Sequence, residues 1–165
     1  MEAAWSLSNL ASGTSQQTEA VVDNGAIPEL TKLLGSSNKE VYSQAVWTLG
    51  NIAGDNVQMR NVVLQGGAVG PLINIVEKAI SEGDMSLIRQ GTWALANLCR
   101  GKPLAPFILL QDMIPVFAKI IMGLEDPDVL MDAFLSISTL SDGNSERIQR
   151  IFDSGVVPFV VKHMK

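Results

Sequence analysis

The chain has 165 residues, 47% of them hydrophobic, and a formal net charge of −5 at pH 7. This negative balance argues against nucleic acid and anionic membranes as partners and favours a basic ligand. A single cysteine, Cys99, excludes an internal disulfide, as is typical of a reducing compartment, and neither a signal peptide nor an apolar run of transmembrane length is visible.

Helical patterns follow one another along the whole chain, separated by short turns rich in Gly, Pro, Asn and Asp. Asn24-Gly25 is a C-cap signal, and Pro28 and Pro115 fit the first turns of helices. We expect the loop at 81–83 to be longer than its counterparts. The expected helices cover 1–12, 16–23, 27–34, 39–54, 57–65, 69–79, 85–100, 104–110, 114–122, 127–140, 145–152 and 156–164.

A Trp/Asn pair with i, i+4 spacing recurs in every third helix of the first three groups. The pairs are Trp5 and Asn9, Trp47 and Asn51, and Trp93 and Asn97; Leu135 and Thr139 take the equivalent places in the fourth group. Successive equivalents are 42, 46 and 42 residues apart. A period in the low forties with helical content predicts an armadillo or HEAT solenoid.

The repeat period divides the chain into one domain of stacked units. Residues 1–13 are expected to form the last helix of one repeat, and 144–165 the first two helices of another. Full three-helix repeats are expected at 14–55, 56–101 and 102–143. We therefore expect a fragment of a longer array, whose uncovered end faces favour self-association.

The tryptophans lie on the polar side of their helices. In the helix around Trp47, Ala45, Leu49 and Ile52 fall on one side and Trp47 on the other, at about 100° per residue. Parallel stacking of the third helices would align the three tryptophans as a ladder and the three asparagines as a row on one concave surface. Core tryptophans, and asparagines that only bridge neighbouring repeats, are the alternatives.

Such a surface suits an extended basic peptide. Indole faces can sandwich the stem of a Lys or Arg and attract its cation, while asparagine amides can bond a peptide main chain. Asp55 ends its helix close to the expected turn at 13–18, so a carboxylate, backbone carbonyls and the Thr18 hydroxyl could surround one ammonium group. Asp128 and Asp132 should also face the groove, although Asp55 and Asp128 could serve only their helix ends.

Catalysis has little support in the sequence. The only histidine, His163, lies next to the C-terminus, and Cys99 falls on the apolar side of its helix, where a core role is expected. Neither a phosphate-binding glycine loop nor metal-ligand spacing is present. We expect a protein that is not an enzyme and that needs no cofactor or metal.

The stretches EAAWSLSNLASGTS, AVVDNGAIPEL, QAVWTLGNIAGD and GTWALANLCRG closely resemble the central repeats of importin alpha (karyopherin alpha), a nuclear import adaptor, from about its second to its sixth repeat. The resemblance implies an all-α, right-handed superhelical armadillo-repeat solenoid with three helices per repeat. It also implies a major site for lysine- and arginine-rich nuclear localisation signals, bound extended and antiparallel to the repeats. A protein of this kind shuttles between cytoplasm and nucleus, and binds importin beta through a segment that this sequence does not contain.

The resemblance assigns roles to individual residues. The tryptophans would wall lysine pockets, the asparagines would hold the main chain, and Asp55 would bind the key lysine. The implied peptide-binding residues are Trp5, Asn9, Gly13, Thr18, Gln44, Trp47, Asn51, Asp55, Gln90, Trp93, Asn97, Asp128 and Asp132. Gln90, Leu135 and Thr139 depart from the family's usual Asn, Trp and Tyr. The alternative function is a generic armadillo scaffold, or a self-associating repeat fragment, without import activity.

Overall fold

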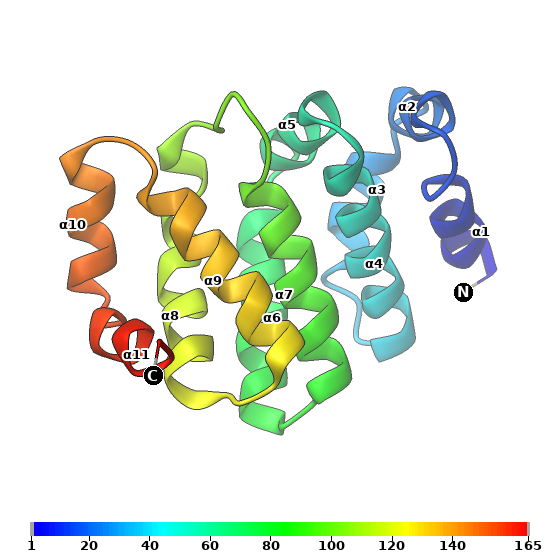
Figure 1. Ribbon diagram of the computed structural model, residues 1–165. Coiled ribbons are helices and arrows are strands. Elements are labelled where there is room, and N and C mark those ends of the chain that lie inside the picture. The colour runs from blue at the N-terminus through cyan, green and yellow to red at the C-terminus, as the bar shows by residue number, and fades with distance from the viewer. Residues whose placement is uncertain (1, 165) are drawn as a thin grey trace.

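Residues 2–164 are described in the computed structural model, so Met1 of the expected first helix lies outside the described part. Every regular element within this range is helical (Figure 1). The elements are α1 Glu2–Leu10, α2 Ser15–Asp23, α3 Ala26–Leu33, α4 Lys39–Asp55, α5 Val57–Gln65, α6 Val69–Glu82, α7 Met85–Cys99, the 3₁₀ helices η1 Phe107–Leu109 and η2 Gln111–Met113, α8 Ile114–Gly123, α9 Pro127–Ser141, α10 Ser145–Asp153 and α11 Val157–Lys162.

The helices form an elongated array with the two termini at opposite ends (Figure 1). Helix α4 packs against α1 and α7, and α7 packs against α9, so these four helices form one continuous row. Helices α3, α6 and α8 each pack behind their own member of that row, namely α4, α7 and α9. This order places α1, α4, α7 and α9 on one shared face. None of the described helices is long and apolar enough to cross a membrane.

Caps and turns fix where the helices begin and end. Thr14 and Gln17 form a capping box, in which the Thr14 N–H donates to Gln17 Oε1 at 2.8 Å and the Gln17 N–H donates to Thr14 Oγ1. Asn24 then ends α2, and Gly25 adopts φ 82°, a left-handed conformation that turns the chain into α3. The expected Asn-Gly terminator is therefore present.

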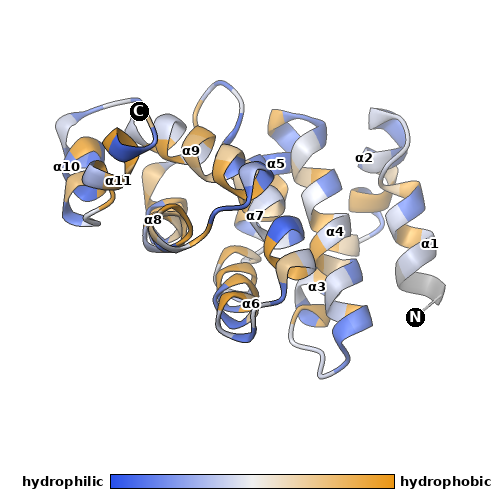
Figure 2. Cartoon of the chain, turned by 60° about the horizontal axis from the view of Figure 1, so that its bottom comes forward, coloured by the Kyte–Doolittle hydropathy of each residue, from blue (hydrophilic) through white to orange (hydrophobic). Residues whose placement is uncertain are grey.

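The core is a continuous layer of aliphatic side chains between the row and the helices behind it. Leu49 and Ile52 of α4, Leu95 and Leu98 of α7, and Phe117 of α8 are each at most 1% exposed. Hydrophobic and hydrophilic positions alternate along the helices in Figure 2, as the amphipathic pattern requires. The polar positions of α4 and α7 are thus left on the shared face.

Two expected elements differ from the structure. The segment 104–110 is not an α-helix but contains the single 3₁₀ turn η1, because Pro103 and Pro106 lack N–H donors. Helix α6 does not end near Ala79 but continues to Glu82, where the left-handed Gly83 (φ 71°) caps it. The extra residues before α7 thus lengthen this helix rather than the loop.

Candidate functional site

The three tryptophans lie on the shared face of α1, α4 and α7. Trp5 is 57% exposed, Trp47 is 42% exposed and Trp93 is half-buried. Their helices are neighbours in the row (Figure 1). Because the aliphatic stripe of each helix is turned toward the core, the indoles remain on its outer side. The structure therefore places this ladder at the surface, although Trp93 is partly covered.

Trp47 and Trp93 stack directly on each other, with ring centroids 5.0 Å apart and an interplanar angle of 28°. Gly50 makes this possible, because a Cβ atom there would lie 2.4 Å from Cζ3 of Trp93. These two indoles therefore contact each other directly, rather than forming the expected sandwich around a ligand side chain. A guest stem must lie beside the pair or separate it, against a stacking energy of about 0.5–1.5 kcal/mol.

The asparagine row is not uniform. Asn9 is exposed, Asn51 is half-buried, and Asn97 is only 3% exposed. Asn97 donates from Nδ2 to the Gly50 carbonyl at 3.0 Å, so it joins α7 to α4. This contact agrees with the alternative interpretation, in which the asparagines bridge neighbouring repeats. The Asn51 Nδ2 atom is buried and has no hydrogen-bond partner within residues 2–164. A buried unpaired donor beside a groove is a ready contact for a peptide carbonyl.

A polar hollow of about 330 Å³ opens at the end of α4. Asp55 accepts hydrogen bonds from Ser15 Oγ at 2.8 Å and from Asn56 Nδ2 at 2.7 Å, which ties the carboxylate to the start of α2. The structure therefore brings Asp55 to the turn after α1, as expected. The walls comprise Ala11, Ser12, Gly13, Thr18, Asn51, Gly54, Asp55, Trp93, Asn97 and Arg100.

Contrary to expectation, the Thr18 hydroxyl does not face the hollow as a free ligand group. Thr18 is 1% exposed, and its hydroxyl donates to the Ala11 carbonyl at 3.2 Å. The hydroxyl proton is therefore used within the fold, and Thr18 shapes the wall of the hollow. Ser15 is the hydroxyl that touches Asp55 instead. The sequence analysis did not single out Ser15, although Ser15 lies in the same turn as Gly13 and Thr18 and was therefore also expected near Asp55.

Arg100 brings a cation to the same hollow, and sequence reasoning did not anticipate it. Its Nη2 atom donates to Asp132 Oδ1 at 3.1 Å, and its side chain is 49% exposed. When the repeats are aligned on their tryptophans, Arg100 occupies the place of Gly54. The arginine at a position where the preceding repeat has glycine is the feature of the sequence that indicates this cation. The Arg100 guanidinium thus lines the hollow that contains Asp55 but is paired with Asp132.

The acidic end of the row is mostly neutralised by arginines. Asp132 is 8% exposed, and burial raises the pKa of its carboxyl while the Arg100 cation opposes that rise. Arg89 pairs with Asp126 at the start of α9 and lowers the pKa of that carboxyl. Asp128 is exposed. Asp132 thus faces the groove as expected, but it is largely buried and paired with Arg100.

Gln44 and Gln90 occupy equivalent places, about one turn before Trp47 and Trp93, and both are half-buried. A second hollow of about 540 Å³ joins α4, α7 and α9 along the row. It is lined by Trp47, Ser86, Arg89, Gln90, Trp93, Asp128 and Asp132. The structure therefore gathers most of the expected residues into two adjoining hollows, one on each side of Trp93.

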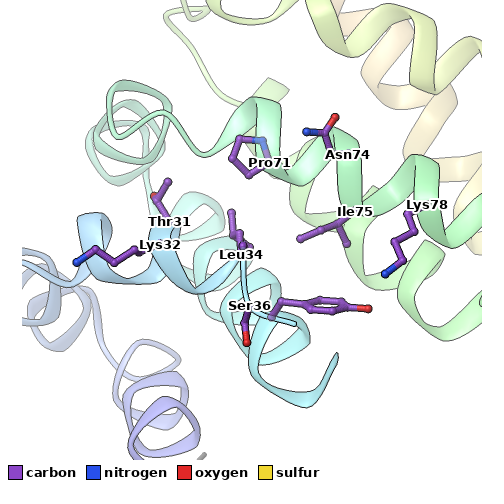
Figure 3. Close-up of a pocket in the computed structure, with 10 residues that line it drawn as sticks. Thr31, Lys32, Leu34, Ser36, Pro71, Asn74, Ile75 and Lys78 are labelled. Atoms are coloured by element: carbon purple, nitrogen blue, oxygen red, sulfur yellow. The ribbon is translucent and has the colours of Figure 1, made fainter. Parts of the chain in front are cut away.

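A third hollow, of about 420 Å³, lies between α3 and α6 on the side away from the row (Figure 3). Tyr42 and Lys78 meet at its rim, with the Lys78 Nζ atom 5.9 Å from the ring centroid. Lys32 also lines it but is paired with Glu29 at 3.0 Å. This hollow holds none of the residues that the sequence singled out.

The reactive residue types lie away from these hollows. Cys99 is fully buried, and burial raises the pKa of its thiol to about 12. His163 is exposed and contacts the Phe159 carbonyl through Nδ1 at 2.8 Å. Residues 2–164 contain no group of three or more His, Cys, Asp or Glu side chains placed to hold a metal ion.

Known proteins match this chain at the level of one repeat and of the whole segment. The Armadillo/beta-catenin-like repeat family matches residues 14–54. Importin subunit alpha-1a of Oryza sativa subsp. japonica is 45% identical over 161 residues, and importin subunit alpha-B of Dictyostelium discoideum is 53% identical over 155. These matches cover 98% and 94% of this chain but only 30% of each relative.

One solved structure with the same fold contains a bound peptide. A designed armadillo repeat protein in complex with the peptide (KR)4 is 28% identical to this chain, with a TM-score of 0.86. The similarity covers 98% of this chain and 66% of the designed protein. The helical array described above therefore has the architecture of an armadillo-repeat solenoid.

Proposed function

This chain is an armadillo-repeat segment of the importin alpha family, as its sequence predicted, and we propose that it binds lysine-rich nuclear localisation signals along the row of α1, α4, α7 and α9. The observation that carries the proposal is the hollow at Asp55, which combines a carboxylate, an unpaired Asn51 donor and the Trp93 indole. These groups suit a lysine side chain on an extended backbone.

The main chain and the side chains of the signal would be held by different groups. Asn9 and Asn51 offer amides to the peptide main chain, and Asp55 binds an ammonium group that enters the polar hollow. The exposed faces of Trp5 and Trp47 attract further basic side chains, at about 0.5–2 kcal/mol each. The designed relative with bound (KR)4 supports a basic peptide as the ligand class.

The chain spans about 30% of the length of the importin alpha relatives it matches. For the whole protein we propose the role of an import adaptor that moves between cytoplasm and nucleus, uses importin beta as its partner and performs no catalysis. A peptide-binding scaffold outside nuclear import is the alternative, and the stacked indoles favour it, because they narrow the space for a lysine stem.

Binding of a fluorescent lysine-rich signal peptide tests the proposal directly. We expect saturable binding that is lost when the central lysines become alanine. Asp55→Lys should weaken affinity about 100-fold, because an ammonium would then face an ammonium, and Trp47→Ala should weaken it about 10-fold. Affinity is measured by fluorescence anisotropy at low salt, and it should fall as ionic strength rises.

Asp112→Lys is the matched control for charge reversal, because Asp112 is exposed in η2 and lines none of the hollows described above. It should bind the peptide nearly as well as the unaltered chain. Circular dichroism establishes that each variant stays helical. Equal binding of the lysine and alanine peptides, with all variants folded, would favour the generic scaffold over a nuclear-signal receptor.

A further inference from the structure

The α9 end of the groove has a different ligand preference from the α4 end. We propose that Leu135 and Met131 form an apolar subsite, which takes an aliphatic side chain flanking the basic residues of the bound peptide. This inference rests on the proposed function and specifies it further. The ligand class becomes a peptide with a basic core and one aliphatic residue beside that core.

Apolar exposure at the ladder position is the first observation. Leu135 takes the place of a tryptophan in the repeat and is 49% exposed, while Met131, one turn earlier on α9, is 56% exposed. Neither side chain offers a π face or a charge to a cation. Both offer an apolar surface, and the unbranched Met131 side chain can adjust its shape to a guest.

Charge is the second observation, because Asp126 and Asp132 at this end already have cationic partners, which leaves the exposed Asp128 as the remaining aspartate near the start of α9. Asp132 accepts from Arg100 at 3.1 Å, and Asp126 accepts from Arg89 Nε at 3.0 Å. Asp55 is held only by the neutral donors Ser15 and Asn56. A second lysine of the peptide therefore gains less at the α9 end than at Asp55.

The main-chain contact is the third observation. Thr139 replaces the asparagine of the repeat, and its hydroxyl donates to the Leu135 carbonyl of its own helix at 3.0 Å. It has no amide with which to hold a peptide backbone, unlike Asn9 and Asn51. Retention of the peptide at this end thus depends on burying a side chain against Leu135 and Met131.

The occupant belongs to the same peptide because the subsite continues the same row. Helix α9 packs directly against α7, which carries Trp93 and lines both groove hollows. Neighbouring helices lie about 8–10 Å apart, a distance that about three extended residues span. A residue flanking the basic core therefore reaches α9 without leaving the groove.

A scan of the flanks tests the subsite. Peptides with one constant lysine-rich core carry Leu, Ala, Lys or Glu at each of four positions on either side of the core. For the unaltered chain we expect one position at which Leu binds about 5- to 10-fold more tightly than Ala, and at which neither Lys nor Glu improves on Ala. Affinities come from competition against the labelled core peptide.

Variants assign the effect to α9. Leu135→Ser should reduce the Leu-over-Ala ratio below about 2, whereas Met122→Ser, which removes an exposed methionine on α8, should leave the ratio unchanged. The double variant Leu135→Trp, Thr139→Asn restores the repeat pattern. It should shift the flank preference from Leu to Lys.

The outcomes separate this inference from the proposed function. A flat flank profile, or a Lys preference in the unaltered chain while the core still binds, overturns the apolar subsite alone. A Glu preference also overturns it and indicates that the flanking residue contacts the arginines at this end, Arg89 or Arg100. No binding of any peptide overturns both the subsite and the proposed function.

Discussion

At the scale of single residues, Arg60 is one of the largest fully buried side chains among the described residues. It is 1% exposed and lies beneath the loop after α7. Its guanidinium donates to the carbonyls of Arg100, Gly101 and Pro103, the last from Nη2 at 2.9 Å. Burial lowers the pKa of this group. One side chain of α5 thus fixes the segment in which two prolines interrupt helical structure.

Replacing Arg60 with Met should lower the free energy of unfolding by about 2–4 kcal/mol, because the carbonyls of the loop lose the donors that hold them. Urea denaturation measures the change. Arg150→Met, an exposed arginine on α10, is the control and should change stability by less than about 0.5 kcal/mol. Similar midpoints for the two variants would mean that Arg60 does not hold the loop.

Helical periodicity predicted which side of its helix each tryptophan occupies, because that depends only on neighbours within one helix. It could not predict that Asn97 donates to Gly50 or that Arg100 pairs with Asp132. These contacts join residues 47 and 32 positions apart, and they depend on how closely two helices approach. The contacts of Arg60 with the loop after α7 could not be predicted for the same reason.

At the scale of helices, one device recurs at the starts of α7 and α9. Asp84 caps α7 by accepting from the Leu87 N–H and pairs with Lys39 of α4. Asp126 caps α9 by accepting from the Val129 N–H and pairs with Arg89 of α7. Helices α7 and α9 are therefore each linked to the preceding helix of the row by a cap that is also an ion pair.

These ion pairs should make the free energy of unfolding depend on pH. The partner cations lower the pKa of Asp84 and Asp126, so the folded chain binds fewer protons than the unfolded chain as pH falls past their ordinary value of 3.8. Their stabilisation is present above that value and is lost below it. Replacing both with Asn keeps a capping side chain and should flatten the fall in unfolding free energy between pH 5 and pH 2, compared with the control Asp112→Asn, as urea titrations at each pH would show.

Two helices were predicted poorly, for different reasons. The segment 104–110 is not the expected α-helix because Pro103 and Pro106 lack N–H donors, and Arg60 of α5 instead holds the carbonyls of Gly101 and Pro103 just before it. The longer α6 was missed because Ser81 and Glu82 look like a loop. The fold class itself was predictable, because the 42-residue period repeats the same helix pattern along the chain.

At the scale of the whole molecule, apolar side chains are exposed at both ends of the array. Leu10 of α1 is 55% exposed beside an apolar hollow between α1, α2 and α3, and at the other end Phe152 of α10 and Val161 of α11 are 58% and 50% exposed. Repeats normally cover such faces with a neighbour. End-to-end association would join unlike faces, and such contacts extend into open chains.

Light scattering should therefore show an average mass that rises with concentration for the segment studied alone. The double variant Leu10→Gln, Phe152→Gln should reduce this rise, because it removes apolar surface from both ends. Leu135→Gln is the matched control, since Leu135 is 49% exposed but lies in the groove rather than at an end. A constant monomer mass at all concentrations would contradict end-to-end association.

The stacked pair of Trp47 and Trp93 also has an optical consequence. Two indoles with centroids 5.0 Å apart are close enough for their electronic transitions to couple. A guest that separates the rings uncouples them, whereas one that lies beside them leaves the pair intact. The protein thus carries its own chromophore for distinguishing two modes of peptide entry, with no dye attached.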